Sequence, residues 1–134
     1  MDLVVVDTDV VSFQFKRDPR ARGFHRHLVG NLGIVSFMTL AELNRWALHR
    51  RWGPALRDRL ELFLGRFTVA HSDSGLCHLW ADVTHRANRR GRPIECADAW
   101  IAATALQLSA PLVTNNPRDY ASVSGLTILS ATSP

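Results

Sequence analysis

Short runs of aliphatic and β-branched residues alternate along this chain with longer stretches of helical pattern, and this alternation limits the folds open to it. The expected strands are residues 3–6, 34–36, 68–70, 111–114 and 126–129. The expected helices are residues 10–15, 21–29, 40–52, 55–67, 74–89 and 97–108. Strands that alternate with helices predict an α/β domain with a mostly parallel sheet.

The composition fits one globular domain over residues 1–134, with 46% hydrophobic and 21% charged residues. No run of 18 apolar residues and no basic leader is present, so we expect a cytoplasmic protein with no membrane association. Cys77 and Cys96 lie far apart without a CxxC partner, which favours two small buried side chains in a reducing compartment.

The basic residues are nearly all arginine. Lys16 is the only lysine among 16 basic residues, and the formal net charge is +4. The planar guanidinium of arginine suits phosphate, which favours a polyanionic partner. A GC-rich genome raises the arginine content in the same way, so charge by itself is weak evidence.

Four carboxylates stand where predicted elements begin or end: Asp7, Glu42, Asp98 and Asp119. Asp7 follows the first strand, and Asn116 and Asp119 follow the strand that ends at Thr114. Glu42 and Asp98 fall in the first turns of two predicted helices. Ligands of parallel sheets bind outside the carboxyl ends of the strands, so we expect all four acids on one rim.

Each acid also has a purely structural explanation. Asp7 or Asp9 can cap the helix that follows. Glu42 comes three residues after Thr39, which is the spacing of a capping box with Thr39 as the cap. These alternatives remain open while each residue is considered alone.

The same holds for the two later acids. Asp98 near a helix start is favoured by the helix dipole, and Asp119 can pair with Arg118. Taken together, however, the four acids would repel one another unless a cation lay between them. Mg²⁺ and Mn²⁺ prefer such oxygen ligands, and either ion can activate water toward a phosphodiester. The set therefore predicts a metal-dependent phosphodiester hydrolase.

Four motifs spread over nearly the whole chain resemble those of a known family. They are Asp7-Thr8-Asp9 after a hydrophobic strand, Ala41-Glu42-Leu43 at a helix start, ADAWIAATA at residues 97–105 and LVTNNPRDY at residues 112–120. The last two, in this order and at this spacing, are the specific ones. The chain resembles PIN domains, and among them the VapC-type toxic endoribonucleases of bacterial toxin–antitoxin pairs.

The resemblance implies a three-layer α/β/α sandwich with a parallel central sheet and an acidic pocket for Mg²⁺ or Mn²⁺. The core acids that hold the metal match Asp7, Glu42 and Asp98. The fourth acidic position is shared between Asn116 and Asp119, because members of the family differ there. The polar lining of the pocket matches Thr8, Thr114 and Asn116. Asp9 departs from the family, which more often has asparagine or serine at this position.

The implied reaction is in-line attack of a metal-activated water on RNA, leaving a 5′-phosphate and a 3′-hydroxyl. Asp7 and Asp98 are the expected principal ligands, and Glu42 and Asp119 are expected to hold a second metal or orient the water. The resemblance also implies a VapB-like antitoxin that covers the acidic pocket, and a homodimer.

A basic cluster precedes Pro93, formed by Arg86, Arg89, Arg90 and Arg92. It can bind RNA phosphates, or it can be a solvated helix end whose charge suits the C-terminal dipole.

Three other functions compete with a toxin nuclease. Two are a solitary PIN nuclease without an antitoxin and a PIN-like module that binds RNA or protein without cutting. The third is an aspartyl-phosphate phosphatase, suggested by the Asp-x-Asp motif after a strand. That chemistry also needs a lysine after the partner strands of the first motif and a later acidic pair, whereas Lys16 is the only lysine and the chain has no Asp-Asp pair.

Overall fold

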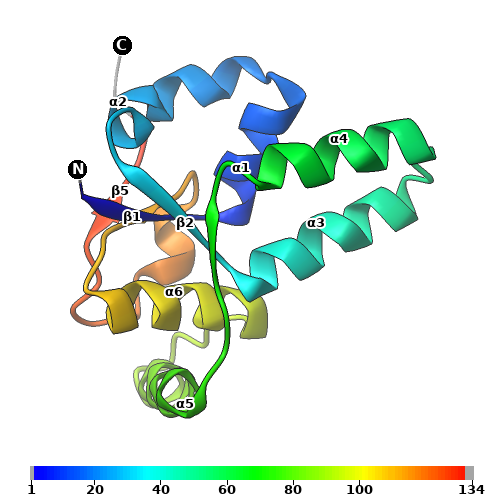
Figure 1. The fold of residues 1–134 in the computed structure, drawn as a ribbon. Coiled ribbons are helices and arrows are strands. Elements are labelled where there is room, and N and C mark those ends of the chain that lie inside the picture. The colour runs from blue at the N-terminus through cyan, green and yellow to red at the C-terminus, as the bar shows by residue number, and fades with distance from the viewer. Residues whose placement is uncertain (1, 132–134) are drawn as a thin grey trace.

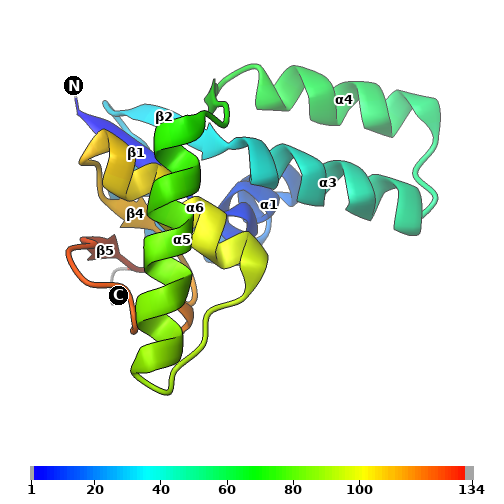
Figure 2. The same cartoon turned by 90° about the horizontal axis from the view of Figure 1, so that it is seen from below.

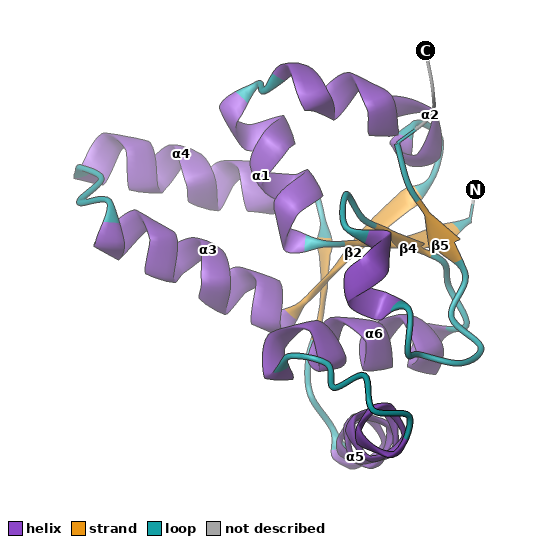
Figure 3. Cartoon of the chain, turned by 180° about the vertical axis from the view of Figure 1, so that it is seen from behind, coloured by secondary structure: helices purple, strands orange, loops and turns teal. Residues whose placement is uncertain are grey.

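The strands form a parallel sheet in the computed structural model, which describes residues 2–131. They are β1 (Leu3–Val6), β2 (Leu32–Ser36), β3 (Thr68–Ala70), β4 (Leu112–Val113) and β5 (Ile128–Leu129). The order across the sheet is β3-β2-β1-β4-β5, and every neighbouring pair is parallel. The chain builds outward from β1 to β3, then returns to add β4 and β5 on the other side. The strand order therefore switches direction between β1 and β4, and Figure 3 shows β4 and β5 side by side.

Helices cover both faces of this sheet (Figures 1 and 2). The α-helices are α1 (Thr8–Lys16), α2 (His25–Leu28), α3 (Phe37–His49), α4 (Pro54–Leu64), α5 (Ser74–Arg89) and α6 (Cys96–Leu108). Two 3₁₀ helices are η1 (Pro19–Phe24) and η2 (Pro117–Tyr120). Helices α1, α3 and α4 lie on one side, α6 lies on the other, and α5 packs outside α6. The predicted three-layer α/β/α sandwich with a parallel sheet is confirmed.

Alternation along β1 divides the core between the two faces of the sheet. Val4 and Val6 pack in a cluster with Leu43 of α3, whereas Val5 packs with Ile101 of α6. All three valines are buried, as expected for the central strand of a sheet that is covered on both sides. Helix α6 packs directly on the sheet, so the first residues of α6 reach the carboxyl edge of β1.

The third helix begins three residues earlier than predicted, and its cap is not Thr39. Ser36, the last residue of β2, is the N-cap, and its hydroxyl accepts a hydrogen bond from the Met38 amide at 3.0 Å. Thr39 is fully buried inside the first turn. The capping box with Glu42 is therefore wrong, because Glu42 lies in the second turn, beyond reach of the cap. The helix also ends at His49 rather than at Trp52.

The segment predicted as one helix over residues 21–29 is divided in the structure. Asp18 caps η1 by accepting from the Arg20 amide, and Pro19 opens this 3₁₀ helix. Only His25–Leu28 is α-helical. A tight start on an Asp-Pro pair favours 3₁₀ geometry, which the apolar periodicity of the sequence does not reveal.

The prediction that both cysteines are buried is wrong. Cys77 and Cys96 are exposed free thiols in the first turns of α5 and α6. Other residues in the first turns of these helices pack in the core instead, because Leu76 and Ala99 are fully buried. Within residues 2–131, no helix has the length and apolar character needed to cross a membrane.

Helix α4 offers a matched test of this packing. Leu60 is 2% exposed and Leu62 is 79% exposed on the same helix. We expect Leu60→Ala to lower the free energy of unfolding by about 2–4 kcal/mol, since it leaves a cavity. Leu62→Ala should change it by less than about 0.5 kcal/mol. Urea unfolding followed by circular dichroism measures both, and equal losses would show that α4 does not pack as described.

Candidate active site

The carboxylate of Asp7 lies at the switch point of the sheet, directly after β1. Asp7 is the N-cap of α1 and is only 6% exposed. Its Oδ1 accepts from the Thr8 amide at 2.8 Å, and its Oδ2 accepts from the Thr114 hydroxyl at 2.7 Å and from the Tyr120 hydroxyl at 3.0 Å. These donors belong to α1, the end of β4 and η2. Asp7 therefore caps a helix and also joins three segments that are distant in sequence.

Burial raises the pKa of Asp7 above its ordinary value, and the charge of Asp119 adds to the effect. The hydrogen bonds from Thr114, Tyr120 and Thr8 oppose the rise, because they stabilise the ionised form. Burial also raises the pKa of Tyr120, with the nearby charges of Asp7 and Asp98 contributing. Tyr120 thus stays neutral and serves as a hydrogen-bond donor to Asp7.

Glu42 reaches the same edge from the second turn of α3. The Thr8 hydroxyl donates to Glu42 Oε1 at 2.8 Å and lies 2.9 Å from the Thr39 hydroxyl. Burial raises the pKa of Glu42, partly offset by the bond from Thr8, and the charge of Asp7 raises it further. Thr39 thus has a different role from the predicted cap, since its buried hydroxyl contacts Thr8.

Asp98 comes from the first turn of α6, on the opposite side of the sheet from α3. The Tyr120 hydroxyl lies 3.4 Å from Asp98 Oδ1, so one phenol stands between the carboxylates of Asp7 and Asp98. Burial raises the pKa of Asp98 to about 7, helped by the charges of Asp7 and Asp119. Asp98 has few partners for a half-buried carboxylate, which leaves it free to bind a ligand.

Asp9 is held by the loop that follows β4. Asn116 donates from its side-chain amide to Asp9 Oδ2 at 2.9 Å, and the Val10 amide donates to Oδ1 at 2.7 Å. Burial and the charge of Asp7 raise the pKa of Asp9 to about 7. The Asn116 backbone amide donates to the Thr114 hydroxyl at 3.0 Å. The side chain of Asn116 therefore binds Asp9. Asp119 is the carboxylate of this loop that forms no side-chain hydrogen bond or ion pair within residues 2–131.

A cavity of about 150 Å³ connects these groups. Five carboxylates line it, those of Asp7, Asp9, Glu42, Asp98 and Asp119. The remaining lining consists of Thr8, Asn116 and Trp46, while Thr114 is fully buried behind Asp7. The structure thus brings together the acids and polar residues that the sequence placed on one rim.

The carboxylates surround the cavity without meeting at one point. Within residues 2–131, no three Asp, Glu, His or Cys side chains are grouped closely enough to enclose a metal ion. The charge of Asp7 raises the pKa values of Asp9, Glu42 and Asp98, in addition to the effect of burial. The donor set consists of hard oxygen atoms, and this chemistry fits Mg²⁺ or Mn²⁺.

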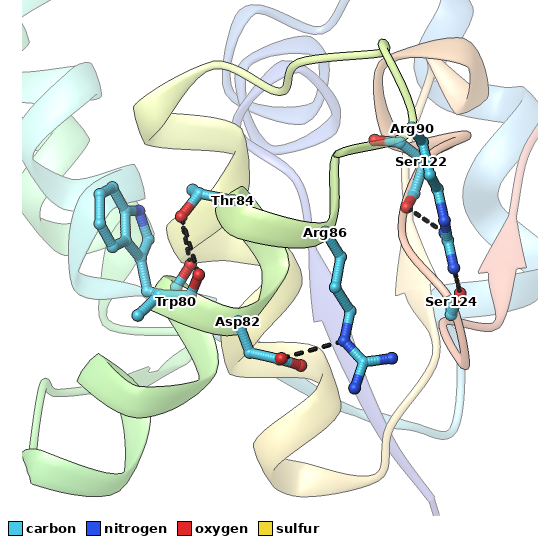
Figure 4. Close-up of polar contacts among 8 residues, drawn as sticks. Trp80, Asp82, Thr84, Arg86, Arg90, Ser122 and Ser124 are labelled. Atoms are coloured by element: carbon cyan, nitrogen blue, oxygen red, sulfur yellow. Dashed lines mark hydrogen bonds and ion pairs between the residues drawn. The ribbon is translucent and has the colours of Figure 1, made fainter. Parts of the chain in front are cut away.

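The predicted arginine cluster is split by the structure. Arg86 pairs with Asp82 on the exposed side of α5, and Arg90 donates to the loop after η2 (Figure 4). Arg89 does not line the hollows described in this section. Only Arg92 does, since it borders a hollow next to the acidic cavity. The four arginines therefore have different surroundings, and their contact with RNA stays a prediction.

Two side chains at the site carried no predicted role. Tyr120 bonds to Asp7 because the 3₁₀ turn of η2 directs it inward, and local sequence does not reveal that turn. Trp46 lines the cavity from α3. Trp46 comes four residues after Glu42, which places both on one helix face. The spacing alone could therefore have predicted that Trp46 lies near the site. The Lys16 Nζ lies 4.8 Å from the centre of the Trp46 ring.

A larger hollow of about 810 Å³ lies away from these acids, between η1, α2 and α4. Its lining combines Arg17, Arg22 and Arg66 with apolar side chains, and Asp18 is its single carboxylate. It has no set of groups suited to hydrolysis, so the smaller acidic cavity is the better candidate for chemistry.

Known proteins resemble this chain over almost its full length. It is 28% identical over 127 residues to ribonuclease VapC1 of Haemophilus influenzae (strain R2866), covering 92% of this chain and 94% of that protein. It is 27% identical over 122 residues to the tRNA(fMet)-specific endonuclease VapC of Shigella flexneri, covering 91% and 92%. Among solved structures, VapBC-1 from nontypeable Haemophilus influenzae superimposes with a TM-score of 0.81 at 26% identity, covering 97% of this chain and 98% of that one.

The family model that matches is that of the PIN domain, and the match runs over residues 4–126. This span contains β1 from Val4 onward, the four motifs and every carboxylate of the cavity. The chain therefore belongs to the PIN domain family.

Proposed function

We propose that this protein is an RNA-cleaving hydrolase, the toxin endoribonuclease of a toxin–antitoxin pair. The observation that carries the proposal is the set of five carboxylates around one cavity at the switch point of a parallel sheet. The raised pKa values of Asp9 and Asp98 reflect burial and a cluster of charge that folding alone does not require. RNA is the proposed substrate because the similar proteins from Haemophilus and Shigella are named as a ribonuclease and a tRNA-specific endonuclease.

The proposed cofactor is Mg²⁺ or Mn²⁺, held by Asp7, Glu42 and Asp98. When bound, such a cation polarises a phosphodiester and makes water a better nucleophile. The oxygen-only donor set supports this choice, as does the mutual repulsion of carboxylates that lack a counter-ion.

The side chains around the cavity have distinct proposed roles. Asp7 is held rigidly by Thr114 and Tyr120, so its position is fixed before any ligand arrives. Asp98 and Asp119 are less restrained. They also line the neighbouring hollow, from which an RNA strand would enter. We assign Asp119 the task of orienting the attacking water. Asn116 positions Asp9 and takes no part in the reaction.

The proposed partner is a VapB-like antitoxin, since the similar Haemophilus protein was solved as VapBC-1. A homodimer stays a prediction from the family resemblance. The alternatives are a solitary PIN nuclease, which the absence of a neighbouring antitoxin gene would indicate, and a binding module that does not cut.

An RNA cleavage assay with and without Mn²⁺ tests the proposal. We expect cleavage with Mn²⁺ or Mg²⁺, none with EDTA, and a loss of about 100-fold or more in Asp98→Asn, as for other groups that stabilise charge at a reacting centre. Asp58→Asn on exposed α4 is the matched control and should cut like the parent. Metal-independent RNA binding without cleavage would favour the binding module instead.

Glu42→Gln separates chemistry from structure at a second position. Glutamine keeps the acceptor for the Thr8 hydroxyl, and Glu42 takes no part in the cap of α3, so the fold should be retained. We expect cleavage to fall at least about ten-fold because an ionised ligand is lost. The melting temperature in EDTA should equal or exceed that of the parent. Parental activity in this variant would remove Glu42 from the proposed ligand set.

Stability should depend on pH through Asp9 and Asp98. Their pKa values are raised from 3.8 to about 7, so the folded protein holds these protons more tightly than the unfolded chain. The stability they contribute is fully present below about pH 4 and is lost as the pH rises through about 7. Mn²⁺ binds ionised carboxylates, so it should raise the melting temperature more at about pH 8 than at about pH 5.5. A shift of the same size at both values would contradict this assignment, and Asp58→Asn serves again as control.

A further inference from the structure

The acidic cavity continues into a second hollow that has a basic end. This hollow has a volume of about 360 Å³ and shares Asp98 and Asp119 with the acidic cavity. Arg92 and Arg118 also line it, together with Glu95. The two hollows are therefore adjacent, and we call them together the two-part cleft, with carboxylates at one end and two arginines at the other.

The backbone of Arg92 is fixed by the way α5 ends. Gly91 adopts a left-handed φ of 70°, the Gly91 amide donates to the Asn88 carbonyl, and the Arg92 amide donates to the Ala87 carbonyl, both at 3.0 Å. These two bonds are the paired bonds of a Schellman motif, which needs the conformational freedom of glycine at this position. Pro93 follows and restricts the chain further. Arg92 is thus presented from a rigid turn.

Arg90 fastens this turn to the other side of the cleft. Its Nη1 donates to the Ser122 carbonyl at 2.7 Å, and its Nη2 donates to the Ser124 hydroxyl (Figure 4). Ser122 belongs to the lining of the second hollow. The end of α5 and the segment after η2 are therefore held together, and the guanidinium of Arg90 is engaged with protein atoms.

Arg118 is fixed from the opposite side. It lies in η2 two residues before Tyr120, which is 1% exposed and bonds through its hydroxyl to Asp7. The Ala121 amide donates to the Arg118 carbonyl at 3.2 Å, which keeps the turn closed. The position of the Arg118 backbone is therefore linked to that of the buried carboxylate at the reacting end.

Neither arginine is neutralised by the acids beside it. Arg92 and Arg118 are exposed, and neither forms an ion pair with a carboxylate of residues 2–131, although Glu95, Asp98 and Asp119 line the same hollow. Their guanidinium groups remain available to an anion. A planar guanidinium binds phosphate oxygens in pairs, and two of them on rigid turns make a phosphate subsite.

We propose that Arg92 and Arg118 bind the RNA phosphate next to the one that is cut. A strand whose scissile phosphate lies over the carboxylates must continue out of the acidic cavity, and the second hollow opens directly from it. The adjacent phosphate then reaches the two arginines, which fix the register of the strand. This inference rests on the proposed function and adds a binding subsite to it.

Arg92→Gln, Arg118→Gln and Arg89→Gln test the subsite, with Arg89 as an exposed control three residues before Arg92 and outside the cleft lining. Binding of a fluorescein-labelled single-stranded RNA is measured by anisotropy in EDTA, and steady-state cleavage is measured with Mn²⁺. We expect Arg92→Gln and Arg118→Gln each to raise Kd and KM about three- to ten-fold with kcat nearly unchanged. Each should reduce the slope of log K against log salt by about 0.7. Arg89→Gln should match the parent.

Replacing one phosphate of the RNA by an uncharged group shows which phosphate the two arginines contact. A methylphosphonate beside the cleaved phosphate should weaken binding of the parent, and it should cause no further loss in the Arg92→Gln/Arg118→Gln double variant. The subsite is wrong if both arginine variants behave like Arg89→Gln, or if they handle RNA normally and lose only the binding of a co-expressed antitoxin. Failure of the parent to cut RNA would instead overturn the proposed function, while the anisotropy data would still decide the role of the arginines.

Discussion

The buried carboxylate of Asp7 sets the arrangement of everything else at this edge of the sheet. An ionised group that is only 6% exposed is costly unless hydrogen bonds compensate for the lost water. Three donors do so, and they come from α1, from Thr114 after β4 and from Tyr120 in η2. Satisfying one carboxylate therefore orders the start of a helix, the end of a neighbouring strand and the turn that carries Asp119. Through this turn, Asp7 also determines where Arg118 stands.

Placing further acids around Asp7 makes the site electrostatically unbalanced. Asp98 approaches from α6 and Glu42 from α3, on opposite sides of the sheet, and burial raises the pKa of both, with the charge of Asp7 raising each further. A protein under pressure for stability alone would replace some of these groups by apolar or amide side chains of similar size. Asn116 is an example of such an amide, because its side chain donates a hydrogen bond to the carboxylate of Asp9 and adds no negative charge. The remaining positions keep carboxyl groups, which is the pattern expected where a cation is to be bound.

The rim of acids could be predicted because the rule for parallel sheets needs only the order of strands and helices. Knowing that Asp7 and Thr114 end parallel strands is enough to place them together, without knowing the strand order. The cap of α3 failed for a local reason, because Ser36 and Thr39 both suit a cap and only the length of β2 selects Ser36. Tyr120 escaped prediction because its contact with Asp7 joins residues 113 positions apart through a 3₁₀ turn. The different surroundings of the four arginines were equally hard to predict, because α5 ends in a Schellman turn at Gly91 and the side chains diverge there.

The two ends of the cleft respond differently to the surroundings, and this difference has a physical basis. The arginines are exposed, so mobile ions screen their attraction for a polyanion over about 8–10 Å at ordinary salt. Four of the carboxylates, Asp7, Asp9, Glu42 and Asp98, are half-buried or buried, where screening is weak and where removal of water strengthens their hold on a cation. The arginines, whose attraction depends on salt, therefore recruit an RNA strand and set its register. The carboxylates, which are shielded from salt, carry out bond cleavage. Because Tyr120 and the Arg90 contacts fix both ends to the same turns, a strand aligned by the arginines meets carboxylates already in place.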